Sequence, residues 1–324
     1  MKHRVLFLGP EGPAYSGSVR AHLPGNFELH AIAATDSSVA DPAGLRIQLA
    51  ATEFLVGWAR VSREMLQQAG ALRLVQLIGA GHDLVDLAAA REYGVTVATV
   101  QGANATSCGE LVFGYVLSLY RQLHAATDSL RRGEWAAQEL RGRGLFELHG
   151  KTLGLVGFGT LGQAVARIGR GFGVKLLYCK RTPLTLAEER RWRVQYAPLD
   201  ELMAQSDIVS VQVNLDESTR GLIGRRQLAL MKPTALICNI GRGAVIDEAA
   251  LAECLLGRRI AGAGLDVFED EPLSPDSPLL RASNLVLTPH VAGSTREAVA
   301  RAIKQACDNV LRVAAGDSPL NVVA

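Results

Sequence analysis

Residues 157–162 form the pattern G-x-G-x-x-G, the arrangement of a phosphate-binding turn. The pattern follows the apolar run 153–156, opens a helical pattern over 163–170, and precedes a second strand-like run at 174–178. Its first glycine permits a tight turn, its second lets backbone approach a pyrophosphate, and its third allows the helix to pack closely on the strand. Free N–H groups at the helix N-terminus then attract the anion. The alternative is a packing turn without a ligand, but the flanking pattern favours a dinucleotide site.

The end of the second strand of this unit carries positive charge. Lys180, Arg181 and Thr182 stand where an NAD site usually has a carboxylate that accepts hydrogen bonds from the ribose hydroxyls. A carboxylate would repel a 2′-phosphate, whereas an ammonium and a guanidinium attract it. The sequence therefore predicts NADP(H) as the preferred cofactor. NAD(H) is the alternative, if these cations are ordinary surface residues.

Arg242, Glu271 and His290 each follow a different apolar run of strand length. Because chemistry in open parallel sheets gathers at the carboxyl ends of the strands, we expect these three side chains at one edge of one sheet. Each has an ordinary alternative. The arginine could pair with a carboxylate at a helix start, the glutamate could be a solvated loop acid, and the histidine could be a satisfied residue near a domain boundary. All three alternatives would have to hold together, which favours a reactive centre.

Strand-length apolar runs alternate with longer helical patterns along the chain, which predicts an α/β fold with helix-covered parallel sheets. The first part, ending near residue 101, has strand candidates at 5–8, 54–56, 74–78 and 95–97, with helices at 62–69 and 87–93. The second part has six strand candidates, the number of a complete dinucleotide-binding sheet. They lie at 152–156, 174–178, 208–213, 235–239, 260–266 and 285–287.

A long helix at 106–123 and an Arg-rich stretch at 128–149 join the two parts. The Arg-rich stretch is interpreted either as a helix and arm or as a solvated surface connection. A last helix at 294–315 follows the sixth strand and could return the chain to the first part. We predict two Rossmann-like or flavodoxin-like domains with a catalytic cleft between them. Residues 1–103 and 291–324 form the substrate-binding (catalytic) domain, and residues 104–290 form the dinucleotide-binding domain.

The bulk properties exclude several classes of protein. The chain has 324 residues. A single hydrophobic core usually stops growing at roughly 250–300 residues, so the length favours two domains. A net charge of +2 gives no case for a nucleic-acid partner. Five scattered cysteines without a C-x-x-C pair indicate reduced thiols and neither a disulfide frame nor a metal site. No run reaches the ~18 apolar residues of a membrane span, so we expect a cytoplasmic protein.

The ordered motifs resemble one family. N-x-x-R-G at Asn239–Gly243, D-V-F-x-x-E-P at Asp266–Pro272 and T-P-H-x-x-G at Thr288–Gly293 follow the glycine motif in the order and spacing of the D-isomer-specific 2-hydroxyacid dehydrogenases. The resemblance covers nearly the whole chain. It implies hydride transfer between NAD(P)H and a small 2-keto acid. It also implies a homodimer joined through residues 106–149.

The resemblance implies a role for each residue of the reactive centre. Arg242 binds the substrate carboxylate and carbonyl, for which a planar guanidinium is suited. His290 donates a proton during reduction and accepts one during oxidation. Glu271 holds the imidazole by a hydrogen bond and raises its pKa. Asp266 contacts the nicotinamide carboxamide.

Ala80 and Gly81, in a loop of the first domain, are expected to bind the substrate carboxylate through backbone N–H groups, together with Arg242 and His290. The expected cofactor contacts are Gly157, Phe158, Gly159, Thr160, Leu161, Gly162, Lys180, Arg181, Thr182, Val213, Asn214, Asn239, Ile240, Gly241, Asp266, Gly293 and Cys108. Three residues depart from the family pattern. Cys108 replaces a frequent threonine, Asn214 a usual proline, and His82 a commonly apolar residue.

Within the family, the residues favour reduction of glyoxylate or hydroxypyruvate. Formate dehydrogenases carry glutamine in place of Glu271, and phosphite dehydrogenases carry lysine in place of Ala80. A phosphoglycerate dehydrogenase-like activity stays open, because Arg60 could reach a phosphate. A non-catalytic, dinucleotide-sensing protein of the corepressor type is the alternative from a different functional class.

Overall fold

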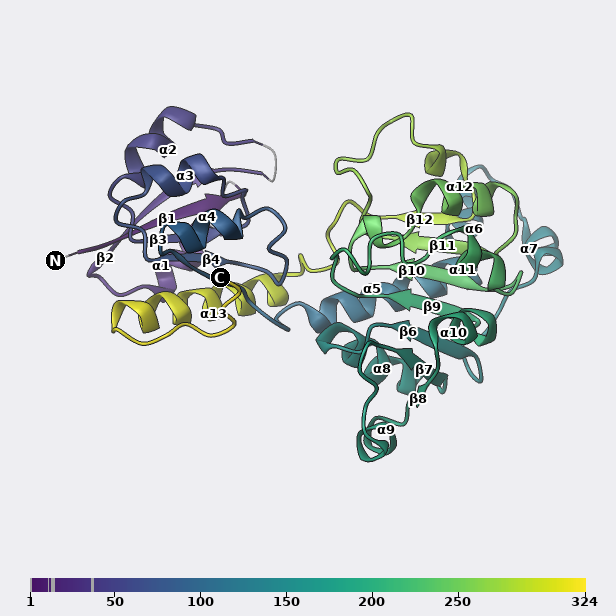
Figure 1. Ribbon diagram of the computed structural model, residues 1–324. Helices are drawn as coiled ribbons and strands as arrows, with labels where there is room; N and C mark the ends of the chain where they lie inside the picture. Colours follow the sequence, from purple (N-terminus) through teal and green to yellow (C-terminus); the bar gives the residue numbers. More distant parts are fainter. Residues whose placement is uncertain (1, 11, 13–14, 36–37) are drawn as a thin grey trace. The chain divides into compact units, whose positions relative to one another are not determined.

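The computed structural model describes residues 2–10, 12, 15–35 and 38–324. The chain forms two compact units (Figure 1). The first comprises Met1–Asn104 and Ser294–Ala324, and the second comprises Ala105–Gly293. The last helix, α13 (Arg296–Ala314), therefore packs in the first unit, and the side chain of Thr295 caps its N-terminus by accepting a hydrogen bond from the Ala298 N–H.

The first unit contains a five-stranded parallel sheet of order β2-β1-β3-β4-β5, the flavodoxin-like order. Its strands are β1 (His3–Gly9), β2 (Phe27–Ala33), β3 (Phe54–Gly57), β4 (Leu74–Leu77) and β5 (Thr96–Ala98). The prediction of four strands was wrong, because it omitted β2. This edge strand buries only Phe27 and includes the polar residues Glu28 and His30, so no continuous apolar run marks it.

Helices cover both faces of this sheet. Val5 and Phe7 of β1 pack with α1 (Ser16–His22) and α13, whereas Leu6 and Leu8 pack on the opposite face. This alternation is the two-residue period of a strand. The helices of the opposite face are α2 (Pro42–Leu49), α3 (Arg63–Gln68) and α4 (Leu87–Glu92).

The second unit contains a seven-stranded parallel sheet of order β12-β11-β10-β9-β6-β7-β8. Its strands are β6 (Thr152–Val156), β7 (Lys175–Cys179), β8 (Gln195–Tyr196), β9 (Ile208–Val211), β10 (Leu236–Asn239), β11 (Gly262–Leu265) and β12 (Leu285–Leu287). The predicted count of six was wrong by one, because β8 has only two residues, both exposed. The strand order reverses between β6 and β9, which is where doubly wound sheets bind their ligands.

Two helices, α5 (Ala105–Tyr120) and α8 (Thr160–Gly171), pack on one face of this sheet. On the other face lie α10 (Leu199–Gln205), α11 (Arg225–Leu230) and α12 (Glu248–Leu256). The Arg-rich stretch contains α6 (Leu123–Arg131) and α7 (Ala137–Arg143), and α9 (Leu186–Trp192) precedes β8. The predicted fold class, two α/β domains with parallel sheets, is confirmed. Across the described residues, no helix combines the length and apolarity needed to cross a membrane.

Candidate active site

The glycine-rich turn links β6 to α8 at the point where the strand order reverses. Gly157 has a φ of +97°, a conformation that favours glycine, and a Cβ there would lie 2.8 Å from Val213 Cγ1. A Cβ on Gly162 would lie 2.4 Å from the Gly157 carbonyl oxygen. Around Gly159, by contrast, a Cβ would meet nothing within 4 Å. Packing therefore requires glycine at positions 157 and 162, whereas Gly159 leaves open space at the N-terminus of α8.

Gln212 holds this turn from the neighbouring strand end, a role that the sequence analysis missed. Its Nε2 donates to the Gly157 carbonyl oxygen at 2.7 Å, and its Oε1 accepts from the Ser210 hydroxyl at 2.6 Å. The side chain is buried, so both contacts lie out of water, where a satisfied hydrogen bond is specific and a missing one is costly. Nothing in the local sequence signals this, because the partner is 55 residues away.

The loop that carries Lys180 and Arg181 is held by Tyr178 of β7. The tyrosine hydroxyl accepts from the Leu184 N–H at 2.8 Å and donates to Glu189 Oε1 at 2.9 Å. Burial raises the pKa of Tyr178 to about 12, so the hydroxyl keeps the proton that it donates. The backbone of the basic loop is thereby held between Tyr178 and Leu184, with Arg181 exposed and Lys180 half-buried.

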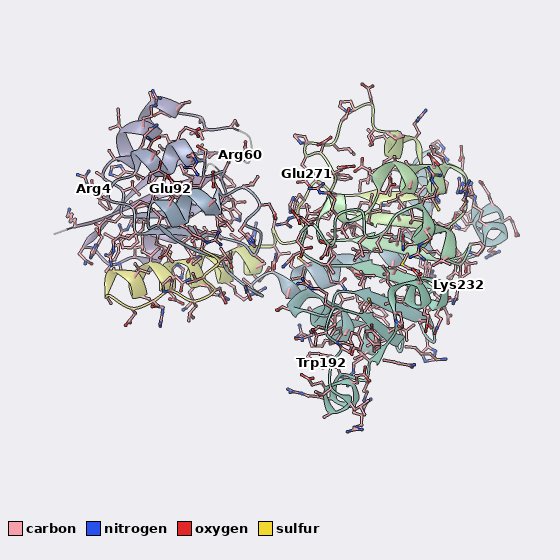
Figure 2. All side chains as sticks on the ribbon, in the orientation of Figure 1. Arg4, Arg60, Glu92, Trp192, Lys232 and Glu271 are labelled. Carbon is pink, nitrogen blue, oxygen red and sulfur yellow. The ribbon has the colours of Figure 1, made fainter. Side chains whose placement is uncertain are left out.

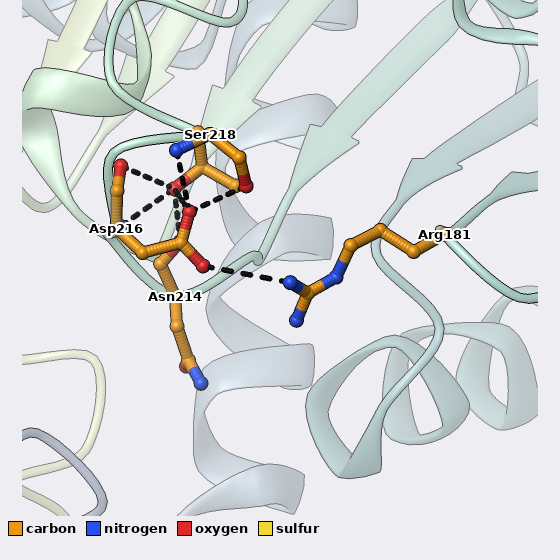
Figure 3. A network of polar contacts seen from close by, with 5 residues as sticks. Arg181, Asn214, Asp216 and Ser218 are labelled. Atoms are coloured by element: carbon orange, nitrogen blue, oxygen red, sulfur yellow. Dashed lines mark hydrogen bonds and ion pairs between the residues drawn. The ribbon is translucent and has the colours of Figure 1, made fainter.

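Arg181 points toward the loop that follows β9, on the other side of β6 (Figure 3). Its Nη1 lies 3.9 Å from Asp216 Oδ2, and the arginine side chain is 86% exposed. Asp216 is itself fixed, because it accepts from the Ser218 N–H at 2.8 Å. The Asn214 side chain points away from this pair (Figure 3). An exposed ion pair of this kind contributes only about 0–1 kcal/mol, so Arg181 remains available to a stronger anion.

His290 and Glu271 of the predicted centre form an ion pair. His290 Nδ1 lies 2.6 Å from Glu271 Oε2, and Glu271 Oε1 accepts from the Phe268 N–H at 3.0 Å. Glu271 lies in the loop that follows β11 (Figure 2). With Nδ1 occupied, the other ring nitrogen, Nε2, is the one left to face a substrate. The family resemblance predicted this partnership, and two loops bring the residues together although they are 19 residues apart in the sequence.

The ionisation of the pair follows from this geometry. The hydrogen bond and the charge of Glu271 raise the pKa of His290, against the opposing effects of burial and of the Arg242 charge. Burial alone would raise the pKa of Glu271. The hydrogen bonds from His290 and Phe268, with the positive charges of His290 and Arg242, lower it instead. The arrangement therefore favours a protonated imidazole beside an ionised carboxylate.

Arg242 lies in the loop that follows β10. Hydrogen bonds with Asn239 and Gly241 hold this loop. Asn239 is buried, and its side chain accepts from the Gly241 N–H at 3.0 Å and donates to the Arg242 carbonyl oxygen at 2.9 Å. The Arg242 guanidinium donates to the Gly241 carbonyl oxygen at 2.9 Å. Both functional groups of Asn239 are thus engaged in shaping the loop. The cofactor contact expected of Asn239 stays a prediction.

Gly243 brings the arginine loop against the loop that carries Glu271. A Cβ on Gly243 would lie 1.8 Å from the Phe268 carbonyl carbon and 2.4 Å from the Glu269 nitrogen. The Glu269 N–H also donates to Glu248 Oε2 at 3.1 Å, which ties the second loop to α12. Backbone therefore lies against backbone here, and only glycine permits this approach. The motif N-x-x-R-G contains this residue, but the sequence alone does not show what it contacts.

Several expected cofactor residues direct their side chains into the protein. The Phe158 ring is buried and packs on Tyr178 with ring centroids 5.1 Å apart. Cys108 is buried, and burial, with the nearby charge of Asp266, raises the pKa of its thiol to about 12. Asp266 is buried and accepts from the Val291 and Ala292 N–H groups at 2.9 and 2.8 Å. These contacts position the loops, and the predicted cofactor contacts remain predictions.

The remaining expected cofactor residues lie in the second unit, in the loops that follow its strands or at the start of α8. They are Thr160 and Leu161 at the start of α8, Thr182 in the basic loop, Val213 after β9, Ile240 and Gly241 after β10, and Gly293 after β12. Apart from Cys108, which lies in α5, the expected cofactor residues thus lie at the carboxyl ends of β6, β7, β9, β10, β11 and β12, at one edge of one sheet.

In the first unit, the expected substrate loop follows β4. Ala80 is exposed and Gly81 is half-buried, and the loop is tied down because the Val100 N–H donates to the Gly79 carbonyl oxygen at 2.9 Å. Arg60 is exposed in the loop after β3, which is the neighbour of β4 in the sheet. His82 is half-buried. These residues follow two neighbouring strands of their own sheet, and their binding roles stay predictions.

Comparison with known proteins identifies the family. The model of the D-isomer specific 2-hydroxyacid dehydrogenase NAD binding domain matches residues 113–292. A glyoxylate reductase from Aeropyrum pernix is 37% identical over 268 residues, which are 82% of this chain and 80% of the relative. The chain belongs to the D-isomer specific 2-hydroxyacid dehydrogenase family. The predicted resemblance is confirmed, and the protein is an oxidoreductase of this family.

Two further comparisons support the same conclusion. A hydroxypyruvate reductase from Thermotoga maritima is 40% identical over 245 residues, 75% of this chain and 78% of the relative. Among solved structures, an acyclic imino acid reductase in complex with NADPH and D-Arg superposes with a TM-score of 0.85 at 25% identity, covering 99% of this chain and 100% of the other. The 2-hydroxyacid dehydrogenase described here therefore uses a nicotinamide dinucleotide. The open space at Gly159 and the uncapped N-terminus of α8 fit its pyrophosphate.

We predict that Gly243→Ala disrupts the centre of this dehydrogenase, because the new Cβ must push the arginine loop away from Phe268. A displacement near 1 Å can lower turnover about 100-fold. We therefore expect kcat/KM for a keto acid to fall by about that factor, together with a lower Tm. Steady-state kinetics and thermal unfolding measure the two effects.

The matched control is Gly171→Ala at the end of α8, outside residues 106–149, where a Cβ would meet nothing within 4 Å. Removing a helical glycine there should leave kinetics unchanged and raise stability by about 0.5–1 kcal/mol. Equal kinetics for the two variants would show that the contact at Gly243 does not position the site.

Proposed function

We propose that this dehydrogenase reduces a small 2-keto acid of the glyoxylate or hydroxypyruvate type to the D-2-hydroxy acid, with His290 as acid and base. The single observation that carries the proposal is the 2.6 Å contact between His290 Nδ1 and Glu271 Oε2 at the sheet edge that also holds Arg242 and the glycine turn. The names of the two relatives reported above support the substrate class. They do not favour the phosphoglycerate-type or corepressor-type alternatives.

The protein groups divide the work of carbonyl reduction. When bound, the nicotinamide cofactor supplies the hydride. Arg242 binds the substrate carboxylate and draws electron density from the carbonyl through its planar guanidinium. His290 Nε2 donates its proton to the carbonyl oxygen as carbon 2 is reduced, which leaves a neutral imidazole. Glu271 stabilises the imidazolium before this step and keeps the ring oriented. In the oxidative direction, the neutral imidazole accepts the hydroxyl proton.

The substrate carboxylate has a second proposed binding element in the backbone N–H groups of Ala80 and Gly81. The exposure of Ala80 after β4 supports this, as does the anchoring of the loop at Gly79. Neutral N–H donors bind a carboxylate without adding a further charge. A small substrate would then be recognised mainly by its carboxylate and its carbonyl.

We infer that NADP(H) is preferred over NAD(H), with NAD(H) as the poorer cofactor. Lys180, Arg181 and Thr182 lie directly after β7, where the adenosine ribose of a dinucleotide lies in this class of fold. Among the residues that the structure describes, Asp216 alone pairs with Arg181, at 3.9 Å, so the guanidinium can turn to a 2′-phosphate. The acyclic imino acid reductase, a structural relative of this chain, was solved in complex with NADPH, which is consistent with this inference.

We also propose that the enzyme forms a homodimer through residues 106–149. Four large apolar side chains of this segment are exposed in the single chain, namely Leu123, Leu130, Trp135 and Leu145. The indole of Trp135 is 84% exposed. Exposed apolar groups gathered on one segment are typical of a protein interface.

Replacing the proposed acid should separate chemistry from binding. We expect His290→Gln to lower kcat for glyoxylate by about 100- to 10,000-fold, the usual contribution of a positioned acid or base. NADPH binding, measured by fluorescence titration, should persist because the phosphate turn is untouched. His22→Gln, at an exposed position in α1 of the first unit, is the control. Retention of near-normal turnover by His290→Gln would rule out the proposed role.

The pKa directions predict a pH effect. Glu271 raises the pKa of His290, and keto-acid reduction needs the protonated imidazole. In Glu271→Gln the charge is lost, so the pKa of His290 falls and reduction fails at a lower pH than in the unmodified enzyme. The loss should be small in acid and large in alkali. The pH profile of kcat/KM measures it, with Glu269→Gln, an exposed acid two residues away, as the control. An unchanged alkaline limit would exclude Glu271 from the mechanism.

Cofactor preference depends on the basic loop. We expect Arg181→Gln to lower kcat/KM for NADPH by about 10- to 100-fold, because a charge-assisted hydrogen bond to the 2′-phosphate is lost. The value for NADH, which lacks this phosphate, should change little. Arg191→Gln in α9 removes the same charge from an exposed site and serves as the control. A clear preference of the unmodified enzyme for NADH would refute the inference.

A further inference from the structure

Helix α5 forms two hydrogen bonds with the turn that carries His290. Near the start of the helix, the Ser107 hydroxyl donates to the Ala292 carbonyl oxygen. Two turns further along, the Tyr115 hydroxyl forms a hydrogen bond with the Thr288 hydroxyl. Both helical side chains are buried, and Tyr115 is only 1% exposed. A helix without a predicted catalytic role thus holds the loop on both sides of the histidine.

The direction of these hydrogen bonds follows from the chemistry of the groups. Asp266 accepts from the Thr288 hydroxyl and from the Val291 and Ala292 N–H groups. An ionised carboxylate only accepts, so the Thr288 proton must point to Asp266. The Thr288 oxygen is then left as the acceptor for Tyr115. The result is a directed chain from the Tyr115 phenol through Thr288 to the buried carboxylate.

The position of the Tyr115 ring is set by the sheet. A Cβ on Gly264 of β11 would lie 2.4 Å from Tyr115 Cγ, so the ring packs directly on bare backbone. Gly264 lies in β11, and Asp266 directly follows the last residue of this strand. The strand that supplies the carboxylate therefore also seats the phenol that points to it.

The hydrogen-bond chain leads to a residue with a strained backbone. His290 has a φ of +53°, in the left-handed region that a histidine rarely adopts. Its N–H donates to the Asp266 carbonyl oxygen at 2.8 Å, and the next two N–H groups donate to the Asp266 carboxylate. A non-glycine residue persists in such a conformation only when its surroundings over-determine it. Asp266 and the groups that hold it supply that constraint.

We infer that Tyr115 is a positioning residue for the reaction: through Thr288 and Asp266 it fixes the left-handed turn that aims His290 at the substrate carbonyl. The inference rests on the proposed function for the role of His290. It gives Asp266 and Thr288 a task in this chain that is separate from any contact with the cofactor. The Tyr115 phenol itself touches neither substrate nor cofactor in this proposal.

The test compares two tyrosines of the same helix. Tyr115→Phe keeps the ring on Gly264 and removes only the hydroxyl. Tyr120→Phe is the matched control, because Tyr120 is equally buried but its hydroxyl donates to the Asp207 carbonyl oxygen at 3.4 Å, away from the histidine turn. Thr288→Val breaks the chain at its second member, whereas Thr288→Ser restores a hydroxyl.

We expect Tyr115→Phe to lower kcat for glyoxylate reduction about tenfold, the scale of one lost buried hydrogen bond. The Kd for NADPH should stay unchanged. The solvent deuterium isotope effect on kcat should increase, because proton donation by a misaligned imidazole becomes slower. Thr288→Val should add little to Tyr115→Phe, since both break the same chain, and Thr288→Ser should retain activity. The amides of Val291 and Ala292 should exchange faster with solvent in Tyr115→Phe, measured without substrate.

The outcomes separate this inference from the proposed function. Equal kcat, isotope effect and amide exchange for Tyr115→Phe and Tyr120→Phe would overturn it. Additive losses from Tyr115→Phe and Thr288→Val would do so as well. Near-normal turnover by His290→Gln would instead refute the proposed acid, and amide exchange at Val291 and Ala292 would still show whether Tyr115 holds the turn.

Discussion

The site of the second unit depends on one buried carboxylate. Asp266 lies at the end of β11 and accepts hydrogen bonds from a hydroxyl and two backbone N–H groups of the loop after β12. Three donors offset the cost of placing a charged group at 1% exposure. Because these donors all belong to residues 288–292, the charge is satisfied only when that loop is folded against β11. The position of the imidazole is therefore coupled to the burial of a charge.

Close backbone approach is the second constraint on the same region. Gly162, Gly243 and Gly264 each stand where a Cβ would lie within 2.4 Å of another group. These glycines seat the phosphate turn, the arginine loop and the Tyr115 ring. Their lack of a side chain makes the sheet edge dense enough to hold several loops in fixed relation. Such density is what allows a reactive group to be placed without its own rigid packing, as for His290, whose side chain is 44% exposed.

Charge is distributed along this edge according to the chemistry proposed for it. At one end, Glu271 raises the pKa of His290 and is itself kept ionised by its hydrogen bonds and by nearby cations. At the other end, Lys180 and Arg181 stand beside the glycine turn, in a loop fixed by Tyr178. The paired charges of Glu271 and His290 favour proton transfer, and the two cations of the basic loop favour an anionic ligand. The glycine turn between them, with open space at Gly159, favours a pyrophosphate.

Hydrophobic patterning in the sequence determined the fold class, and β6 and β12 have the predicted bounds because apolar residues predominate in both. The ordered motifs likewise identified Arg242, Glu271 and His290, since residues after parallel strands must meet at one edge. Strands β2 and β8 escaped prediction, because edge strands with polar or exposed residues carry no such pattern. Only the tertiary structure decided the partners: Gln212 beneath the glycine turn, Gly243 against Phe268, and Tyr115 on Thr288 across 173 residues. A hydrogen bond between distant segments leaves no periodicity in either one, so its existence is set by the packing of strands and helices that bring the two ends together.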